Sequence, residues 1–251
     1  QEGNAYFNFL ASHDGIGLRP VEGKLDSTEL YRLINKMRDL GGKISYKTSQ
    51  WGEEIPYEIN ITYLDSLKST FNGEEKFQIK RFICAHTIMF AMEGIPAIYI
   101  HSFLGTKNDH KAIAAGEGNR SINRFKWDKK DIYKNLEDKN SNNFYIMSKL
   151  NSLLNIRSKQ PAFHPNATQF TLNLGDEVFG LWRQDKKRKQ SIFSIYNVTS
   201  KSVKLSLQKI NLIETEKWID LISGEALKDI DDDILLKPYQ SLWISNYNSE
   251  K

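Results

Sequence analysis

The sequence predicts an α/β domain followed by an all-β domain. Up to about residue 160, short apolar runs typical of strands alternate with long stretches of helical periodicity. From about residue 165 the apolar residues alternate in short runs, which indicates an antiparallel sheet. We therefore expect two domains, residues 1–164 and 165–251, and a hydrophobic fraction of 39% is enough to build a core.

The first part of the chain begins with strand-like and helical segments in a defined order. Ala5–Ala11 has the texture of a buried strand, and Asp26 or Ser27 can cap the helix that follows. Ile44–Thr48 and Ile55–Ile61 then have the pattern of the two arms of a loose hairpin.

The next segments repeat the order of strand and helix. Phe77–Glu93 predicts a long helix that is apolar on most of its circumference and therefore buried on several sides. Ile95–Ile100 is continuously apolar, as expected of a parallel strand covered on both faces. The charged patch at 126–140 predicts a solvated loop, and residues 144–157 predict another amphipathic helix.

This order amounts to two βα units, each with a large loop after its strand. A closed parallel barrel needs eight such units, so the pattern resembles the last βα units of a (β/α)8 barrel followed by a small C-terminal antiparallel β domain. In such barrels the loops after the strands carry the active site, which directs attention to the residues that follow Ala5–Ala11.

Composition excludes several classes of function. The net charge is only +4, and its densest basic run, Lys186–Lys189, lies between two strand-like segments, as in a solvated hairpin turn rather than a nucleic-acid surface. No apolar stretch is long enough to span a membrane. One cysteine, Cys84, precludes an intramolecular disulfide and suits a reducing compartment, so we expect a cytoplasmic protein. The start at Gln1, without Met or a signal segment, suits a fragment.

His13, Asp14 and Gly15 directly follow the first strand. A carboxylate beside a histidine can hydrogen-bond sugar hydroxyls and stabilise developing positive charge. The alternative is a strand-end aspartate that caps the next turn. Residue chemistry alone leaves both interpretations open.

Five segments together resemble the α-amylase superfamily of glycoside hydrolases and transferases. They match most closely the branch that contains sucrose phosphorylase and glucosylglycerate phosphorylase. The segments lie in the expected order and cover nearly the whole chain: Tyr6–Gly17, Tyr57–Tyr63, Gly94–Tyr99, Arg120–Arg124 and Arg157–Pro165.

This resemblance implies roles for individual residues. Asp14 matches the acid that stabilises the transition state by binding the 2- and 3-hydroxyls of the glucosyl unit, and His13 matches a neighbour that contacts the same sugar. Either Arg120 or Arg124 matches an arginine of the glucosyl site, and the motif does not decide between them.

The resemblance places Tyr57 and Glu58 on a mobile loop that shapes the acceptor and phosphate side. Sucrose phosphorylases typically have glutamine at the position of Glu58 and aspartate at that of Ile55, and the chain also departs from them at Arg19. These departures weigh against sucrose as the substrate. Arg19 would suit an anionic acceptor such as glycerate, because guanidinium pairs bidentately with carboxylate, although an arginine on a solvated loop explains it equally well.

Retaining glucosyl transfer also needs two carboxylates about 5–5.5 Å apart, a nucleophile and an acid/base. In this superfamily they lie on the fourth and fifth strands, ahead of the seventh, where this chain begins. We do not expect local loop acids to replace them; these acids are Glu53, Glu54, Asp65 and Asp109.

The sequence is therefore interpreted as part of an enzyme that transfers the glucosyl unit of an α-glucoside to phosphate and forms α-glucose 1-phosphate. This chain alone should be inactive. The resemblance implies no metal and no organic cofactor, and we expect neither a nucleic acid nor a membrane as partner. Two alternatives stay open: a hydrolase or transglucosidase of the same superfamily, and a non-catalytic module that forms a homo-oligomer through exposed faces of its partial barrel.

Overall fold

The computed structural model describes residues 4–73, 76–210, 212, 217–227, 229 and 232–246. The chain divides into two compact units that do not follow the linear order of the sequence. Unit 1 comprises Gln1–Asn8, Ile83–Ala97 and Lys149–Lys251, and unit 2 comprises Phe9–Phe82 and Ile98–Ser148. The boundary at 164/165 stays a prediction.

In unit 2, the first helix forms where its capping residues predict it. Helix α1 spans Ser27–Asp39, and Asp26 is its N-cap in a reciprocal capping box with Glu29. The apolar face of α1, with Ile34 and Met37, packs into a cluster of buried residues with Leu18, Ile44, Ile59 and Ile61.

A three-stranded antiparallel sheet completes the core of unit 2. Strands β3 (Lys43–Thr48) and β4 (Glu54–Asn60) form the predicted hairpin, and β2 (Ile16–Gly17) pairs with the other edge of β4. The register sets Gly17 opposite Glu58, so the segment after His13 and Asp14 runs directly beside β4.

Short helices shape the rest of unit 2. They are η1 (Arg19–Val21), α2 (Tyr63–Ser66), α4 (Ile100–Phe103), α5 (His110–Ala114), η2 (Asn119–Asn123) and α6 (Lys129–Glu137). The prediction of a loop over 126–140 was wrong for α6. Most of its side chains are charged, but Ile132 and Leu136 lie one turn apart and are half-buried. The Asp128 carboxylate accepts hydrogen bonds from the amides of Lys130 and Asp131 and starts the helix.

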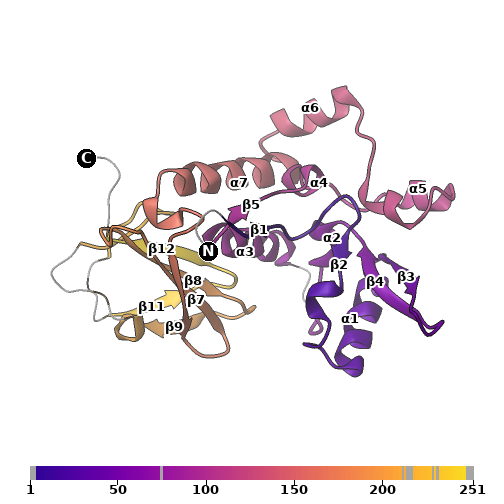
Figure 1. The fold of residues 1–251 in the computed structure, drawn as a ribbon. Coiled ribbons are helices and arrows are strands. Elements are labelled where there is room, and N and C mark those ends of the chain that lie inside the picture. Colours follow the sequence, from indigo (N-terminus) through magenta and orange to yellow (C-terminus); the bar gives the residue numbers. More distant parts are fainter. Residues whose placement is uncertain are drawn as a thin grey trace. The chain divides into compact units, whose positions relative to one another are not determined.

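In unit 1, two short strands are parallel neighbours. Strand β1 (Phe7–Asn8) pairs with β5 (Ile95–Pro96), and α3 (Gln78–Ala91) lies between them in sequence (Figure 1). Both strands are shorter than predicted, and the expected burial was wrong: Phe7 is 66% and Ile95 49% exposed. A parallel strand is covered only when layers pack on both faces, and the described part of the sheet contains just this pair.

The end of the chain forms the antiparallel sheet predicted from its alternating pattern. Five strands lie in the order β10-β12-β8-β7-β6, and a separate pair joins β11 to β9. Their bounds are β6 Thr168–Asn173, β7 Val178–Gln184, β8 Ser191–Asn197, β9 Val203–Ser206, β10 Ile219–Asp220, β11 Asp233–Leu236 and β12 Ser241–Ser245. Helices α7 (Asn142–Ser158), η3 (Pro161–Phe163) and η4 (Leu207–Ile210) complete the described elements.

The basic run between β7 and β8 is the predicted hairpin turn. The Asp185 carboxylate accepts hydrogen bonds from the backbone amides of Lys187, Lys189 and Gln190. These hydrogen bonds hold the backbone of the turn, and the absence of a nucleic acid as partner stays a prediction.

A buried arginine ties this sheet to the end of α3. Arg183 on β7 donates hydrogen bonds to the carbonyl groups of Ala91, His164, Ala167 and Thr168. Burial lowers the pKa of Arg183 to about 10. Since its partners are carbonyl groups rather than carboxylates, Arg183 has a structural role.

Within the described ranges, no helix combines the length and apolarity needed to cross a lipid bilayer.

The buried Cys84 thiol leads to a prediction about stability at high pH. Burial raises the pKa of this thiol from 9.0 to about 11. The protonated thiol therefore contributes stability that is present below about pH 9 and is lost as the pH rises toward 11. We expect Cys84→Ala to remove this dependence, so the wild type loses about 2 kcal/mol more than the variant by pH 11. Urea unfolding of both proteins between about pH 8 and 11 measures it, and parallel curves would contradict it.

Candidate functional site

His13 and Asp14 occupy the tip of a tight turn in unit 2. Two backbone hydrogen bonds between Ser12 and Gly15 close the turn, at 2.9 and 3.1 Å. The Ser12 hydroxyl also accepts a hydrogen bond from the Asp14 amide at 3.2 Å. The turn therefore holds the backbone of Asp14 while leaving its side chain 34% exposed.

Gly15 is required by the close approach of this turn to β4. Its φ is +117°, a region that favours glycine, and a Cβ at this position would lie 2.2 Å from the carbonyl oxygen of Ile59. The absent side chain lets β2 begin at the next residue and pair with β4. The glycine at this position thus has a specific steric cause.

Three cationic or polarisable groups converge on one oxygen of Asp14. Arg124 Nη2 lies 3.0 Å from Asp14 Oδ1, Arg120 Nη1 lies 3.1 Å away, and His13 Nε2 lies 3.2 Å away. Sequence analysis left the choice between Arg120 and Arg124 open, and the structure brings both to the aspartate.

Arg120 also pairs with a second carboxylate, that of Glu58 on β4. Its Nε and Nη2 donate to Glu58 Oε1 and Oε2 at 3.2 and 2.8 Å, and its Nη2 lies 3.4 Å from the Tyr57 hydroxyl. The hydrogen bond to Glu58 raises the pKa of Arg120 above its usual range. Arg120 therefore bridges two carboxylates that come from different elements.

Two asparagines that sequence analysis did not assign to the site hold the backbone of the turn. Asn60 Nδ2 donates to the carbonyl of Asp14 at 2.7 Å. Asn123 Nδ2 donates to the carbonyls of Ser12 and His13 at 3.2 and 3.0 Å. Both lie inside motifs that carried the family resemblance, so their position beside Glu58 and Arg124 was the signal that could have identified them.

Arg19 lies outside this group of contacts. It is exposed and begins η1, one residue after Leu18, whose amide donates to the carbonyl of Tyr57. Its backbone is therefore close to the predicted acceptor loop, while its side chain extends into solvent.

The loop acids that were not expected to act as catalysts have structural partners. Asp65 accepts hydrogen bonds from the Asn108 amide and from Gln78, and Asp109 caps α5 through the amide of Ala112. Glu54 accepts a hydrogen bond from the Thr48 hydroxyl. These hydrogen bonds give each of the three acids a structural role, so no catalytic role is needed to account for them.

A pocket of about 540 Å³ lies beside the two arginines. Arg120, Arg124 and Lys126 line it together with Ser45 and residues 117–121. Glu117 partly balances this charge through an ion pair with Lys126 at 3.2 Å. Polar and cationic walls suit a small anion or a hydroxylated ligand.

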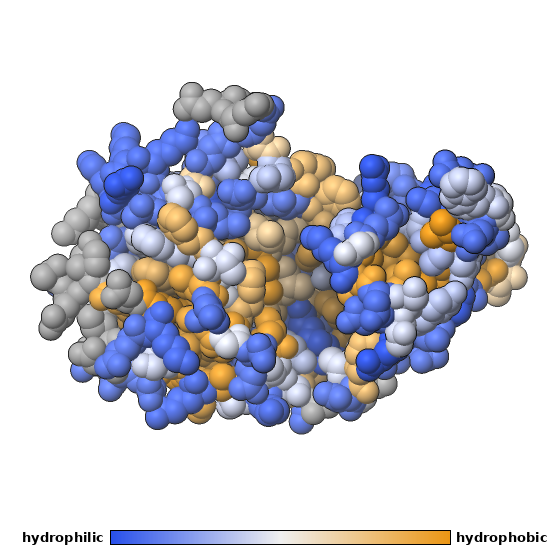
Figure 2. Space-filling model, turned by 60° about the horizontal axis from the view of Figure 1, so that its bottom comes forward, coloured by the Kyte–Doolittle hydropathy of each residue, from blue (hydrophilic) through white to orange (hydrophobic). Residues whose placement is uncertain are grey.

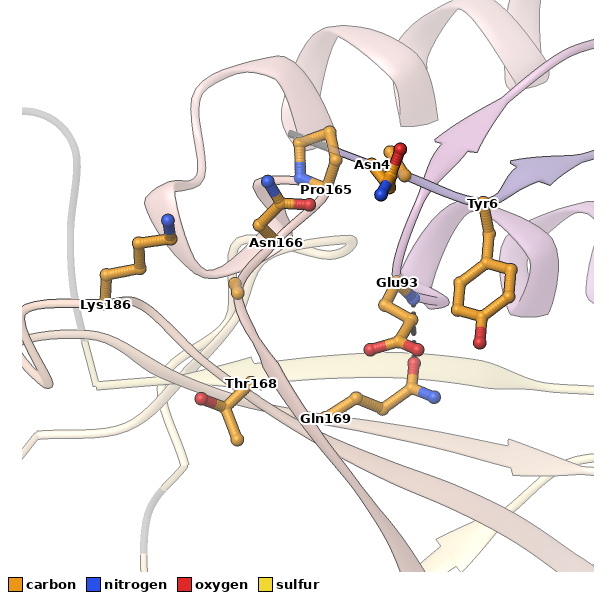
Figure 3. A pocket seen from close by; sticks show the side chains of 10 residues that line it. Asn4, Tyr6, Glu93, Pro165, Asn166, Thr168, Gln169 and Lys186 are labelled. Carbon is orange, nitrogen blue, oxygen red and sulfur yellow. Dashed lines mark hydrogen bonds between the residues drawn. The ribbon is translucent and has the colours of Figure 1, made fainter. Parts of the chain in front are cut away.

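A second pocket, of about 770 Å³, lies in unit 1 (Figure 3). Glu93 and Gln169 face each other there, joined by a hydrogen bond from the Glu93 amide to the Gln169 side chain, while Lys186 lies on the opposite side of the view. None of the residues that sequence analysis assigned to the site lines this pocket.

Within the described residues, no group of three or more His, Cys, Asp or Glu side chains is arranged to hold a metal ion. The imidazole of His101 contacts the Thr106 hydroxyl at 3.1 Å, and burial lowers its pKa.

The fold is similar to that of solved proteins of the α-amylase type. A sucrose 6F-phosphate phosphorylase from Thermoanaerobacter thermosaccharolyticum matches with a TM-score of 0.56 and 20% identity, over 92% of this chain and 41% of that chain. An Anoxybacillus α-amylase matches with a TM-score of 0.52 and 18% identity, over 74% and 36% of the two chains. These likenesses define the class of fold.

Curated relatives identify the branch more narrowly. Glucosylglycerate phosphorylases of Escherichia coli and Allomeiothermus silvanus are 34% and 35% identical over 95% and 97% of this chain, and the match covers 41% of each relative. Sucrose phosphorylase of Streptococcus mutans is 29% identical over 62% of the chain and 30% of its own length. No family model matches the chain. The chain is thus a homologue of glucosylglycerate phosphorylases, and it spans about two fifths of the length of those that it matches.

The steric role of Gly15 leads to a matched pair of variants. Gly15→Ala forces a Cβ against the Ile59 carbonyl and should destabilise the protein by more than about 1 kcal/mol. Gly17→Ala, two residues away, has open space around the new methyl group and should change stability by less than about 0.5 kcal/mol. Urea unfolding measures both, and equal losses for the two variants would contradict this explanation.

Proposed function

We propose that the chain is the C-terminal portion of a retaining α-glucosyl-transferring glycoside phosphorylase. Under this proposal β1 and β5 are the seventh and eighth strands of a (β/α)8 barrel, and the antiparallel sheet belongs to a C-terminal domain. The parallel pairing of β1 with β5, with α3 between them in sequence, supports this assignment. The antiparallel order of the last strands supports the second domain.

The proposed reaction passes the glucosyl unit of an α-glucoside to inorganic phosphate and forms α-glucose 1-phosphate. Net retention proceeds through a covalent glucosyl-enzyme and needs two carboxylates about 5–5.5 Å apart. We place both on barrel strands outside this chain, so the chain alone should not turn over substrate. The structural partners of Asp65 and Asp109 support that placement.

The convergence of Arg120, Arg124 and His13 on Asp14 carries the proposal. Groups held in place before the reaction stabilise developing charge without the cost of reorganising them. We assign Asp14 to stabilising the oxocarbenium-like transition state, and His13, Arg120 and Arg124 to the glucosyl site. Neither a metal ion nor an organic cofactor takes part in this scheme.

For the acceptor, the curated relatives favour glycerate over fructose. The relatives at 34% and 35% identity are named glucosylglycerate phosphorylases. Tyr57 and Arg19 would lie on the acceptor and phosphate side, where the guanidinium of Arg19 can pair with a carboxylate or phosphate. We propose a cytoplasmic enzyme with an α-glucoside and phosphate as its ligands.

Self-association is a second proposal for this chain when it is separated from the rest of a phosphorylase. Hydrophobic surface, orange in Figure 2, reaches solvent in several places on the face shown. Phe7 and Ile95 are among the exposed large apolar side chains. Such surface favours association between copies, and a monomer in size-exclusion chromatography would contradict it.

The proposed activity is tested on the full-length protein that contains this chain. Purified enzyme is incubated with glucosylglycerate or sucrose, with and without phosphate, and the products are assigned by NMR. We expect α-glucose 1-phosphate to form only with phosphate, and faster from glucosylglycerate. Free glucose at the same rate with or without phosphate would indicate a hydrolase instead.

The role of Asp14 predicts the behaviour of Asp14→Asn in the same enzyme. Loss of the carboxylate should lower kcat by about 100- to 1,000-fold, the usual cost of removing one preorganised electrostatic group. The thermal midpoint should change little, because the Asp14 side chain is partly exposed. Asp128→Asn, which alters only the cap of α6, should keep its kcat. A kcat near that of the wild type in Asp14→Asn would refute the role.

A further inference from the structure

Glu58 is the most deeply buried carboxylate of the site. It is 3% exposed, and its two oxygens accept three hydrogen bonds, two from Arg120 and one from Asn60. A buried carboxylate is tolerated only when it is paired and hydrogen-bonded. With so little exposed surface, Glu58 is poorly placed to contact a substrate directly.

Both partners of Glu58 also hold Asp14. Arg120 Nη1 lies 3.1 Å from Asp14 Oδ1, and Asn60 Nδ2 donates to the backbone carbonyl of Asp14 at 2.7 Å. Glu58 is therefore linked to Asp14 by one route through the side chain and another through the backbone. The Ser45 hydroxyl also holds the Asn60 side chain in place, because it donates a hydrogen bond to Asn60 Oδ1 at 2.6 Å.

The geometry of the guanidinium makes the first route directional. Glu58 takes the edge formed by Nε and Nη2, and the planar, rigid fork then fixes where Nη1 points. Nη1 points at Asp14. Without Glu58, Arg120 would keep its contact with Asp14 but lose the pair of bonds that sets the plane of its guanidinium.

We propose that Glu58 is a positioning residue, which acts on Asp14 through Arg120 and Asn60 and does not bind the acceptor itself. The inference rests on the proposed function, since it concerns the group assigned to stabilise the transition state. It also gives Glu58 a role in charge balance: two carboxylates, Asp14 and Glu58, face two guanidinium groups, those of Arg120 and Arg124.

The first test is kinetic and uses the full-length phosphorylase. Glu58→Gln should lower kcat about 10- to 100-fold, the scale expected when a catalytic group is displaced by about 1 Å. KM for the glucoside and for phosphate should stay within about threefold of the wild type, because Glu58 does not contact them. A raised KM with an unchanged kcat would overturn the inference.

Asp65→Asn is the matched control. Asp65 is a carboxylate of the same unit that accepts hydrogen bonds from Asn108 and Gln78, away from the contacts of Asp14. Its loss should lower the thermal midpoint and leave kcat unchanged. An equal fall in kcat for Asp65→Asn and Glu58→Gln would overturn the inference, because it would reduce the role of Glu58 to general stability.

A double-mutant cycle tests the route through Arg120. If Glu58 acts through Arg120, combining Glu58→Gln with Arg120→Lys should lower kcat little more than Arg120→Lys alone. If the two losses multiply, Glu58 acts independently of Arg120 and the inference fails. Glu58→Asp keeps the buried charge but shortens the side chain, so it serves where Glu58→Gln does not fold. It should also lower kcat, and a wild-type kcat would overturn the inference.

A structural test separates this inference from the proposed function. If the wild-type enzyme does not form α-glucose 1-phosphate, the proposed function fails whatever Glu58 does. The crystal structure of the 251-residue chain with Glu58→Gln then decides the positioning role. We expect the Arg120 guanidinium to rotate and Nη1 to leave hydrogen-bond distance of Asp14. An unchanged separation of 3.1 Å would overturn the inference.

Discussion

The bridge that Arg120 forms between Glu58 and Asp14 is the interaction on which the site depends. One of its carboxylates is buried and the other partly exposed, so the pair joins the interior of unit 2 to its surface. The buried Glu58 limits the rotation of the Arg120 guanidinium. This restriction fixes the direction in which Nη1 points toward the partly exposed Asp14. Arg124 and His13 reach the same oxygen of Asp14, and the other contact of Arg124, through Nε, is with the backbone carbonyl of His13 rather than with a buried carboxylate.

This bridge is possible because of the way the backbone approaches β4. Gly15 allows the turn to pass against Ile59, and the pairing of β2 with β4 then sets Gly17 opposite Glu58. The side-chain amides of Asn60 and Asn123 donate hydrogen bonds to three carbonyls of the turn and so fix its backbone. The charged groups therefore meet because of three features together: the missing side chain at Gly15, the register of β2 with β4, and the hydrogen bonds from the two asparagines.

Elements with local signals could be predicted from the sequence, and elements that depend on distant partners could not. The capping residue Asp26 and the apolar periodicity of α3 act within a few turns, so the helices formed where they were expected. Helix α6 has a local cap, but its charged side chains outnumber the apolar pair Ile132 and Leu136, which is why it was taken for a loop. The burial of β1 could not be judged, because a parallel strand is covered by elements that need not be near it in sequence.

The same division holds for the site. Asp14 and His13 were indicated by their place after a predicted strand, and the two arginines by the resemblance of the segment Arg120–Arg124 to the family. The motifs could not show that Glu58 is buried, because its side chain lies on the face of β4 opposite the core residue Ile59 and is covered by Arg120, which is distant in sequence. Nor could they show that one side-chain amide, that of Asn60, serves both Glu58 and the backbone of Asp14.

All contacts of Asp14, Arg120, Arg124 and Glu58 described above lie within unit 2. Under the proposed function, the electrostatic half of the active site is therefore assembled without the strands that supply the nucleophile and the acid/base. Preorganisation of this kind is effective because the groups do not have to move when charge develops. The arrangement of this electrostatic half then depends on three residues that do not bind the sugar. Glu58 binds Arg120, and Asn60 and Asn123 bind the backbone of the turn.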